Sequence, residues 1–271
     1  MKFLSISIVA LFTLSACTKT TDVDCESETI LAPRIILVAG QSNTHAGLGL
    51  DENIDAPESG IYQLGRFEND MCIIQACEPL DHHTKTQNMI GFALSFAKLL
   101  KEYENAANDI LIVPCGFGGT GFMDNRWNKS NDLYEDAVAR VNHLRDTYPN
   151  SELAAILWHQ GETDVILNNP DYGASLDGFI NNLRTDIAAE QVPLILGGMV
   201  PYWVQQAPDR EATQAIIADT PNRHNNVGYA DPAIPFVIEK PNNTFDEIHF
   251  SAAGQRELAQ RYFSAYLELV E

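Results

Sequence analysis

The sequence predicts an α/β fold in which helices cover both faces of a parallel sheet. Short apolar runs with the composition of buried strands alternate with longer segments whose apolar residues recur every three to four positions. This alternation is typical of parallel sheets, because the chain returns to the start of each new strand through a crossover helix. No internal repeat or low-complexity segment interrupts it, and the length suits one domain.

The first sixteen residues have the pattern of an export signal. Lys2 gives a basic start, a mostly apolar stretch from Leu4 to Leu14 follows, and small residues precede Cys17. The stretch is too short to span a membrane. Leu14-Ser15-Ala16-Cys17 resembles the lipobox of bacterial lipoproteins, which implies cleavage before Cys17 and lipid on its thiol. An ordinary secretory signal with an incidental cysteine is the alternative.

Three parts are therefore expected: a lipoprotein signal peptide at 1–16, a lipidated tether at 17–32 and one folded domain at 33–271. The lipobox resemblance implies an exported lipoprotein of a bacterial cell envelope, at the outer membrane or cell surface or in the periplasm. Membrane contact is expected through the lipid anchor only.

Acidic residues outnumber basic ones, and the formal net charge of the chain is -20. Loss of Lys2 with the signal peptide makes the mature protein more acidic by one charge. This excess repels phosphate backbones and anionic lipid headgroups, so nucleic acid is not expected as a partner. A neutral substrate is easier for such a protein to accept than a polyanion.

Four cysteines remain after Cys17, and an exported protein lives where disulfides persist. They are Cys25, Cys72, Cys77 and Cys115, which allow three full pairings. Cys72 and Cys77 lie in one expected loop and could close a small ring, and Cys115 suits a buried thiol at a strand end. Zinc binding is the weaker interpretation, because no Cys-x-x-Cys pair is present. The connectivity stays open.

Four apolar runs are predicted to be strands, and a fifth is less certain. They are Ile35–Ala39, Ile110–Pro114, Leu153–Trp158 and Leu194–Val200, with the fifth around Phe236–Ile238. The segments between them carry helical stripes at Phe92, Phe96, Leu99 and Tyr103, at Leu133, Ala137, Val141 and Leu144, and at Leu176, Phe179, Ile180, Leu183 and Ile187. A last helix is expected from Ala252, capped by Ser251, burying Leu258, Tyr262, Phe263, Tyr266 and Val270.

Polar clusters follow several of these strands or precede the last helix. They are Gly40–Asn43, Gly116–Thr120, His159–Glu162 and Asp246–His249. In open parallel sheets ligands bind outside the carboxyl ends of the strands. One such cluster predicts a turn, whereas four at one edge predict a site.

Ser42, Asp246 and His249 suggest nucleophilic chemistry at that edge. A hydrolytic serine needs a base within hydrogen-bond reach and a third group that orients the base. Asp246 stands three positions before His249, and Ser42 follows the first strand. No Gly-x-Ser-x-Gly elbow is present, which disfavours the α/β-hydrolase version of this chemistry.

Four ordered blocks make the chain similar to the SGNH (GDSL-like) hydrolases, specifically to carbohydrate esterase family six and the sialate O-acetylesterases. The blocks are Gly40–Asn43, Val113–Thr120, Trp158–Asp164 and Asp246–Ser251. The resemblance spans the chain from about Pro33 to its end. It implies a three-layer α/β/α sandwich with a mostly parallel central sheet, flavodoxin-like in layout.

The resemblance also implies roles. Ser42 is expected to attack an ester carbonyl, His249 to take and return the proton, and Asp246 to hold the imidazole. The oxyanion is expected to meet the backbone N–H groups of Ser42 and Gly119 and the side-chain amide of Gln160.

Three points depart from the family pattern or stay open. Gln160 stands where the wider superfamily offers an asparagine. Glu162 is an alternative to Asp246 as the orienting acid. Gly118 competes with Gly119 as the backbone donor.

Other conspicuous side chains receive mostly structural interpretations. His159 is expected to support the site without acting as a base, and the pair His82-His83 to be solvated. Aromatic residues could line a sugar groove or a pocket wall, because aromatic faces pack well on pyranose rings. The candidates for the groove are Trp127, Tyr202 and Trp203, and those for the wall are Phe117 and Phe122.

The predicted function is a metal-independent, cofactor-free serine esterase that removes O-acetyl groups from a carbohydrate. The expected partner is an acetylated poly- or oligosaccharide, and the acidity favours acetylated xylan over sialic acid. The alternatives are a sialate O-acetylesterase, a general short-chain ester hydrolase and, in another class, a lipoprotein that binds glycan without hydrolysing it.

Overall fold

The computed structural model describes residues 28, 30, 32–105, 108–240 and 246–271. The expected signal peptide and most of the tether, with Cys17 and Cys25, lie outside the described residues. Within them no helix is long and apolar enough to cross a lipid bilayer.

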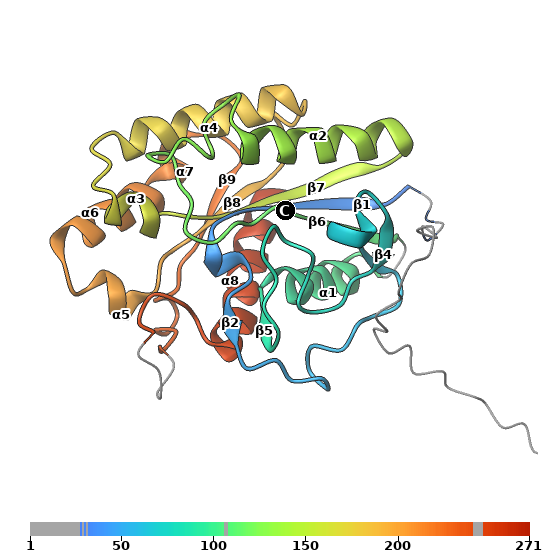
Figure 1. Ribbon diagram of the computed structural model, residues 1–271, viewed down its shortest axis with the longest axis horizontal. Coiled ribbons are helices and arrows are strands. Elements are labelled where there is room, and N and C mark those ends of the chain that lie inside the picture. Colours follow the sequence, from blue (N-terminus) through green and yellow to red (C-terminus); the bar gives the residue numbers. More distant parts are fainter. Residues whose placement is uncertain (1–27, 29, 31, 106–107, 241–245) are drawn as a thin grey trace, which may run out of the picture.

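A seven-stranded sheet forms the centre of the described chain, in the order β4-β3-β6-β1-β7-β8-β9 (Figure 1). Every neighbouring pair is parallel except β3 and β4, which are antiparallel at one edge. The strands are β1 (Arg34–Gly40), β3 (Ile61–Leu64), β4 (Ile73–Gln75), β6 (Ile110–Pro114), β7 (Glu152–His159), β8 (Leu194–Gly197) and β9 (Val227–Ala230). A small antiparallel pair joins β2 (Gly47–Leu48) to β5 (Met89–Ile90).

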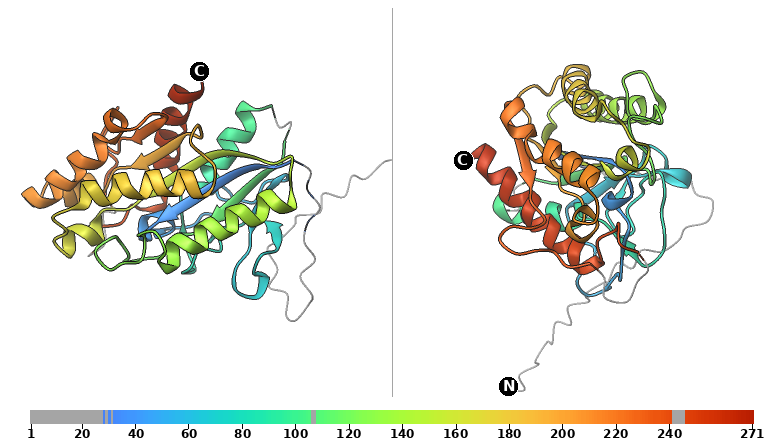
Figure 2. Two further views of the ribbon diagram at one scale, coloured as in Figure 1. Left: turned by 90° about the horizontal axis from the view of Figure 1, so that it is seen from above. Right: turned by 90° about the vertical axis from the view of Figure 1, so that its left-hand side faces the viewer.

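Helices form a layer on each face of the sheet, which confirms the expected α/β/α sandwich with a mostly parallel sheet (Figures 1 and 2). On one face α1 (Ala93–Tyr103) packs against α8 (Ala252–Val270), and on the other α2 (Asp132–Thr147) packs beside α4 (Tyr172–Asp186). The remaining helical elements are α3 (Glu162–Ile166), α5 (Pro201–Val204), α6 (Pro208–Ala218), α7 (Thr220–Arg223) and the 3-10 turns η1 (Ser42–Thr44) and η2 (Phe67–Asn69).

The apolar residues that the sequence predicts to face the core from α2 and α4 are all buried, so both helical patterns are confirmed. In α1 the buried face is rotated, since Leu100 is buried whereas Leu99 is half-buried and Tyr103 is 45% exposed. The last helix begins at Ala252 as expected. The Ser251 hydroxyl accepts a hydrogen bond from the Gly254 N–H at 3.1 Å, which caps it.

The fifth predicted strand is wrong. Residues 236–238 form no strand, and Phe236 and Val237 are exposed. The last strand is β9 instead, whose sequence Val-Gly-Tyr-Ala is too short and too mixed to give a strong apolar signal. The predicted strand Leu194–Val200 also ends earlier, at Gly197.

Two aromatic residues expected near a sugar belong to the core. Trp127 and Phe122 are buried and pack against Trp158 and Phe179, with ring centroids 4.2–6.2 Å apart in this cluster. Both residues follow a glycine-rich block in the sequence, and this position alone does not indicate that their side chains point into the core. Trp203 is buried as well, whereas Tyr202 is exposed and Phe117 is half-buried.

The sulfur chemistry is settled for three cysteines. Cys72 and Cys77 are both disulfide-bonded, and Cys115 is a buried free thiol. Burial, above all, raises the pKa of the Cys115 thiol to about 12. This thiol therefore stays protonated and unreactive at neutral pH.

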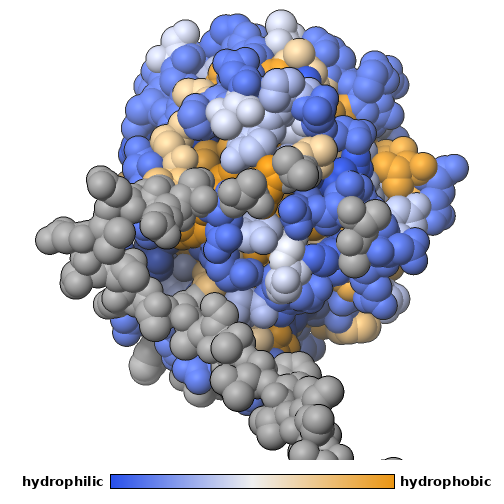
Figure 3. Space-filling view, turned by 90° about the vertical axis from the view of Figure 1, so that its right-hand side faces the viewer, coloured by the Kyte–Doolittle hydropathy of each residue, from blue (hydrophilic) through white to orange (hydrophobic). Residues whose placement is uncertain are grey.

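Polar residues cover most of the face drawn in Figure 3. Figure 3 shows one end of the molecule as mainly hydrophilic, with small separate apolar areas. Scattered apolar residues of this kind are normal on a soluble domain surface.

Candidate active site

Ser42 lies directly after the central strand β1, at the carboxyl edge of the sheet. The chain reaches it through Gly40, whose φ is +126°. A Cβ atom on Gly40 would lie 2.1 Å from the carbonyl oxygen of His159 at the end of the neighbouring strand β7. The Gln41 N–H donates to that same oxygen at 2.8 Å. Only glycine permits this close approach, which fixes the start of η1 against β7.

The structure brings Ser42, His249 and Asp246 into one hydrogen-bonded row. His249 Nε2 lies 2.7 Å from the Ser42 Oγ, and His249 Nδ1 lies 2.6 Å from Asp246 Oδ2. Because Asp246 Oδ2 accepts, the proton of a neutral imidazole belongs on Nδ1. Nε2 is then free to accept the proton of the serine hydroxyl.

The second oxygen of Asp246 holds the backbone of its own loop. Asp246 Oδ1 accepts the N–H groups of Ile248 and His249, each at 3.1 Å. Partial burial alone raises the pKa of Asp246, but His249 and these two N–H groups outweigh burial and keep that pKa below its ordinary value. Asp246 is therefore ionised at neutral pH.

Glu162 does not orient the His249 ring in this structure. The Glu162 side chain is fully buried, and its Oε1 accepts a hydrogen bond from Asn43 Nδ2 at 2.6 Å. The imidazole of His249 is held by Asp246 instead. Between the two acids considered from the sequence, the geometry selects Asp246.

Gln41 and Asn43 connect the first block, Gly40–Asn43, to the other blocks. Gln41 Oε1 accepts from Thr163 N at 3.1 Å and from Gly161 N at 3.5 Å, at the start of α3. Asn43 contacts Glu162 and both neighbours of His249. Both side chains flank Ser42, but no role for either of them is predicted from the sequence.

Gly118 of the second block lies beside Ser42. A Cβ on Gly118 would lie 3.6 Å from the Ser42 Cβ, whereas Gly119 is exposed with φ at +71° and open space around it. The Phe117 N–H donates to the Gly40 carbonyl at 3.0 Å and ties this loop to the end of β1. These contacts leave both glycines as candidate donors.

Gln160 is held by other groups of the site. Its Nε2 donates to Asp164 Oδ2 at 2.7 Å and also approaches Gln41 Oε1 at 3.3 Å and the Thr120 carbonyl at 3.4 Å. The side chain is buried, and its Oε1 has no hydrogen-bond partner. To serve an oxyanion, this amide would have to turn one N–H away from its present acceptors, so its expected role stays a prediction.

Asp164 holds the segment that follows the second block against the third block. Its carboxylate accepts from Phe122 N and Met123 N, each at 2.9 Å, and from Gln160 Nε2 and Asn169 Nδ2, each at 2.7 Å. Four donors satisfy a buried carboxylate without a cation.

The interpretation of His82 as solvated is wrong. His82 is fully buried, its Nδ1 accepts from Gly116 N at 2.9 Å, and its ring stacks on His45 at 5.0 Å. Burial lowers the pKa of His45 to about 4, with His249 and His83 adding to the effect, and burial likewise lowers the pKa of His82 well below 6.5. Both rings are therefore neutral supports beside the second block.

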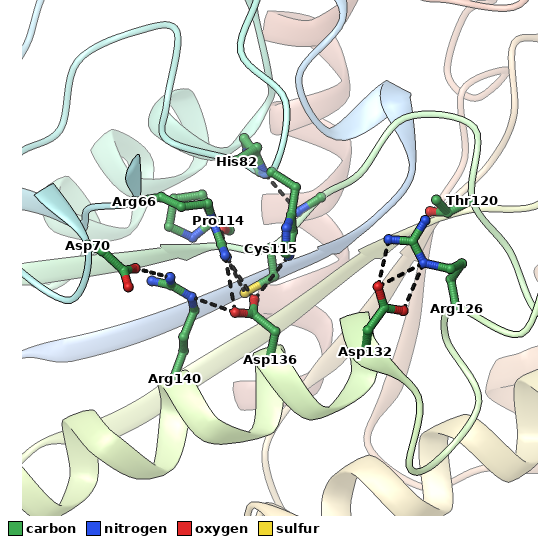
Figure 4. A network of polar contacts seen from close by, with 12 residues as sticks. Arg66, Asp70, His82, Pro114, Cys115, Thr120, Arg126, Asp132, Asp136 and Arg140 are labelled. Carbon is green, nitrogen blue, oxygen red and sulfur yellow. Dashed lines mark hydrogen bonds and ion pairs between the residues drawn. The ribbon is translucent and has the colours of Figure 1, made fainter. Parts of the chain in front are cut away.

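A partly buried ion network, absent from the sequence predictions, lies at the start of that block (Figure 4). Arg66 and Arg140 converge on Asp136, with distances of 2.8–3.1 Å, and Arg66 also donates to the Pro114 carbonyl at 3.2 Å. Burial raises the pKa of Asp136, but hydrogen bonds from His83 and Arg66 dominate and hold it well below its ordinary value. The carboxylate is therefore ionised and fixes the end of β6.

Metal ligands do not gather around this site. Among the residues that the structure describes, no three His, Cys, Asp or Glu side chains are grouped so that they could hold a metal ion.

The sequence comparisons match carbohydrate esterases. Residues 32–268 match the family model described as carbohydrate esterase, sialic acid-specific acetylesterase. A probable carbohydrate esterase of Arabidopsis thaliana is 34% identical over 145 residues, which cover 52% of this chain and 53% of that relative. A probable 9-O-acetyl-N-acetylneuraminic acid deacetylase of Escherichia coli K12 is 28% identical over 246 residues, covering 71% of this chain and 73% of the relative.

Solved structures share the fold. The X-ray structure of an Arabidopsis thaliana protein has a TM-score of 0.72 at 26% identity, covering 87% of this chain and 98% of that one. The crystal structure of NanS has a TM-score of 0.77 at 22% identity, covering 90% and 99%. The placement in carbohydrate esterase family six stays a prediction. On the family match over residues 32–268, the chain belongs to the sialic acid-specific acetylesterase family of carbohydrate esterases.

Proposed function

We propose that the protein is a serine esterase that removes O-acetyl groups from a sialic acid or a closely similar sugar. Ser42 is the nucleophile, His249 the general base and acid, and Asp246 the acid that orients the imidazole. The observation that supports this assignment best is the hydrogen-bonded row of these three side chains, with distances of 2.7 and 2.6 Å.

In the proposed reaction the Ser42 oxygen attacks the acetyl carbonyl carbon while its proton passes to His249 Nε2. The C–O bond to the sugar then breaks, and His249 returns the proton to the departing sugar oxygen. Water, deprotonated by His249, next attacks the acetyl group on Ser42, and acetate leaves as Ser42 regains its proton. The proposed oxyanion donors are the backbone N–H groups of Ser42 and of Gly119 or Gly118, with Gln160 as a third.

The substrate is proposed from the comparisons. The family description and the name of the Escherichia coli relative both point to acetylated sialic acid. A neutral glycan such as acetylated xylan is the second candidate, because the net charge of -20 disfavours anionic ligands at long range.

We also propose that residues 1–16 direct export and that Cys17 carries a lipid anchor on a bacterial cell envelope. The support is the sequence Leu14-Ser15-Ala16-Cys17 after a short apolar stretch. Cys17→Ala should release the protein from the detergent phase of a phase separation. Wild-type protein found wholly in the aqueous phase would contradict the anchor.

Acetate release tests the activity and the substrate together. Protein lacking residues 1–17 is incubated with 9-O-acetylated sialic acid, acetylated xylan and p-nitrophenyl acetate, and acetate or nitrophenol is measured. The proposal expects turnover of the acetylated sialic acid and loss of all turnover in Ser42→Ala. Hydrolysis that persists in Ser42→Ala would overturn the mechanism, and turnover of xylan alone would select the second substrate.

A further inference from the structure

Asn43 joins the nucleophile segment to the segment that carries the base. Its Nδ2 donates to the Ile248 carbonyl at 2.9 Å, and its Oδ1 accepts the Phe250 N–H at 3.1 Å. These two backbone groups belong to the residues on either side of His249. The Asn43 side chain, next to Ser42, therefore forms hydrogen bonds to the backbone on both sides of His249.

The remaining N–H of Asn43 points to Glu162. Asn43 Nδ2 lies 2.6 Å from Glu162 Oε1, and both side chains are fully buried. The amide thus uses both hydrogens and its oxygen, so that its orientation is fully determined. A buried acceptor at the Glu162 position is what stops this amide from turning over.

The surroundings of Glu162 suit an uncharged acid. Among the described residues no Lys or Arg forms an ion pair with Glu162, and its Oε2 has no hydrogen-bond partner. His159 faces this carboxyl group, with its Nε2 3.9 Å from Glu162 Oε1. A buried carboxylate whose only side-chain donor is Asn43, and which has no Lys or Arg partner, is unfavourable because such contacts do not repay the cost of burying an ion.

The tautomer of His159 strengthens this point. The Tyr262 hydroxyl donates to the Trp158 carbonyl at 2.7 Å, so its oxygen can only accept from His159 Nδ1 at 3.1 Å. Neutral His159 therefore carries its proton on Nδ1 and turns the lone pair of Nε2 toward Glu162. A lone pair facing a carboxylate is repulsive, whereas a proton on the acid removes the repulsion.

We propose that Asn43 and an uncharged, protonated Glu162 form a positioning pair that holds the His249 loop against the Ser42 segment, an inference that rests on the proposed function. Neither residue touches the substrate in this proposal. They act by keeping His249 Nε2 within hydrogen-bond distance of the Ser42 hydroxyl.

The charged groups around Glu162 agree with its neutral form. Burial raises the pKa of Glu162, although the backbone N–H of Glu162 itself, the Asn43 hydrogen bond and the charge of His249 offset part of the rise. Burial lowers the pKa of the facing His159 to about 3, so that ring supplies no positive charge. Tyr172 from α4 and Tyr262 from α8 also interact electrostatically with Glu162. Burial raises the pKa of both hydroxyls well above 10.

Substitutions at Glu162 separate the neutral from the charged form. Gln matches a protonated Glu, because its oxygen accepts from Asn43 and its amide donates where the acid proton would be. Glu162→Gln should keep kcat within about threefold of wild type, whereas Glu162→Ala and Asn43→Ala should each lower kcat by about tenfold or more at similar KM. The acid limb of the pH profile of kcat/KM should be the same in wild type and Glu162→Gln.

An infrared difference spectrum tests the protonation state without any turnover. Wild type minus Glu162→Gln at pH 7 should contain the C=O stretch of a protonated carboxylic acid that shifts in D2O. A carboxylate band in its place, or an acid limb that moves to lower pH in Glu162→Gln, would overturn the inference. This readout stands even where Glu162→Ala fails to fold, and Ser42→Ala reports separately on the proposed function.

Discussion

The Oγ of Ser42 and the Nε2 of His249 lie 2.7 Å apart although 207 positions separate the two residues. Two contacts at the start of α8 create this proximity. Gln255 Nε2 donates to the Asn43 carbonyl at 2.9 Å, and Leu48 forms an isolated parallel bridge with Ser251. Since α8 packs on β8, β9 and α1, the loop that carries His249 leads directly into a helix packed on the sheet, beside the end of β1.

Asp246→Asn should nearly abolish activity. An amide nitrogen in place of Oδ2 would repel the Nδ1–H and favour the tautomer with the proton on Nε2, which cannot accept from Ser42. We expect kcat to fall by about 10³–10⁴, as for the corresponding change in serine proteases. Stopped-flow or steady-state kinetics with p-nitrophenyl acetate measure the effect.

Glu247→Gln is the matched control for that substitution. Glu247 lies next to Asp246 but bonds Gln206 at 3.2 Å, away from the imidazole. Its removal should leave kcat within about threefold of wild type. Equal losses in Asp246→Asn and Glu247→Gln would mean that general loop charge, and not orientation of His249, carries the effect.

Gln160→Ala distinguishes an oxyanion donor from a structural amide. A lost oxyanion donor lowers kcat by about 10²–10³ with little change in KM. The structure adds a second expectation, because Gln160 is buried and donates to Asp164 at 2.7 Å. Its truncation should lower the free energy of unfolding by about 1–3 kcal/mol. Enzyme kinetics and urea unfolding of one preparation measure both effects.

Asp164→Asn serves as the control for Gln160, since it weakens the same hydrogen-bond cluster and leaves the Gln160 amide in place. A drop in kcat as large as that of Gln160→Ala would assign both effects to the fold of the second block. A near-normal kcat in Gln160→Ala would leave the oxyanion to backbone N–H groups alone.

The location of the site could be predicted from sequence because it depends on local patterns. Polar residues directly after apolar strands must lie at the sheet edge, which placed Ser42 and Gly116–Thr120 correctly. The Asp246–His249 pair lies within one short loop, so its spacing alone suggested contact. Strand β6 was predicted with its observed bounds, since all five of its residues are buried.

The supporting contacts could not be predicted, because each joins residues far apart in the chain. Asn43 and Glu162 are 119 positions apart, and Arg66 and Asp136 are 70 positions apart. The short strands β3 and β4 give no clear signal in the sequence because polar residues, including Gln63 and Gln75, break their apolar pattern. His82 is predicted to be solvated but is buried, because its loop folds over the second block. Local residue spacing does not indicate such a contact.

Gly40→Ala should severely destabilise the fold. The added Cβ would lie 2.1 Å from the His159 carbonyl oxygen, and φ is +126°, where L side chains are strained. We expect the free energy of unfolding to fall by about 3 kcal/mol or more, through the clash and the backbone strain together. The thermal midpoint of the soluble fraction, followed by circular dichroism, measures the loss.

Gly178→Ala is the matched control, because Gly178 lies inside α4 with no atom within 4 Å of an added Cβ. Replacing a helical glycine by alanine should stabilise the protein by up to about 1 kcal/mol. A Gly40→Ala protein as stable as wild type would show that the turn after β1 can relax, contrary to the close approach of β1 and β7.

Stability should be greatest near pH 6.5 and fall on either side. Burial lowers the pKa of His45 to about 4, of His159 to about 3 and of His82 well below 6.5, so these rings are neutral when folded and bind protons on unfolding below pH 6.5. Their contribution is present above pH 6.5 and is lost as the pH falls toward their folded pKa values. Each such proton changes the free energy of unfolding by about 1.4 kcal/mol per pH unit.

Two buried acids act with the opposite sign. Burial raises the pKa of Glu78 to about 8 and also raises that of Glu162, so both release a proton on unfolding above pH 4.5. They offset part of the histidine effect between pH 4.5 and 6.5, and above pH 6.5 they reduce stability, Glu78 until about pH 8. The free energy of unfolding, measured with urea from pH 4.5 to 9, should therefore pass through a maximum. Glu78→Gln should flatten the alkaline side of this profile.

His82→Asn, whose oxygen can still accept the Gly116 N–H, should make the acid side of the profile less steep by about one proton. Unchanged slopes in both variants would mean that these groups titrate alike in the folded and unfolded protein.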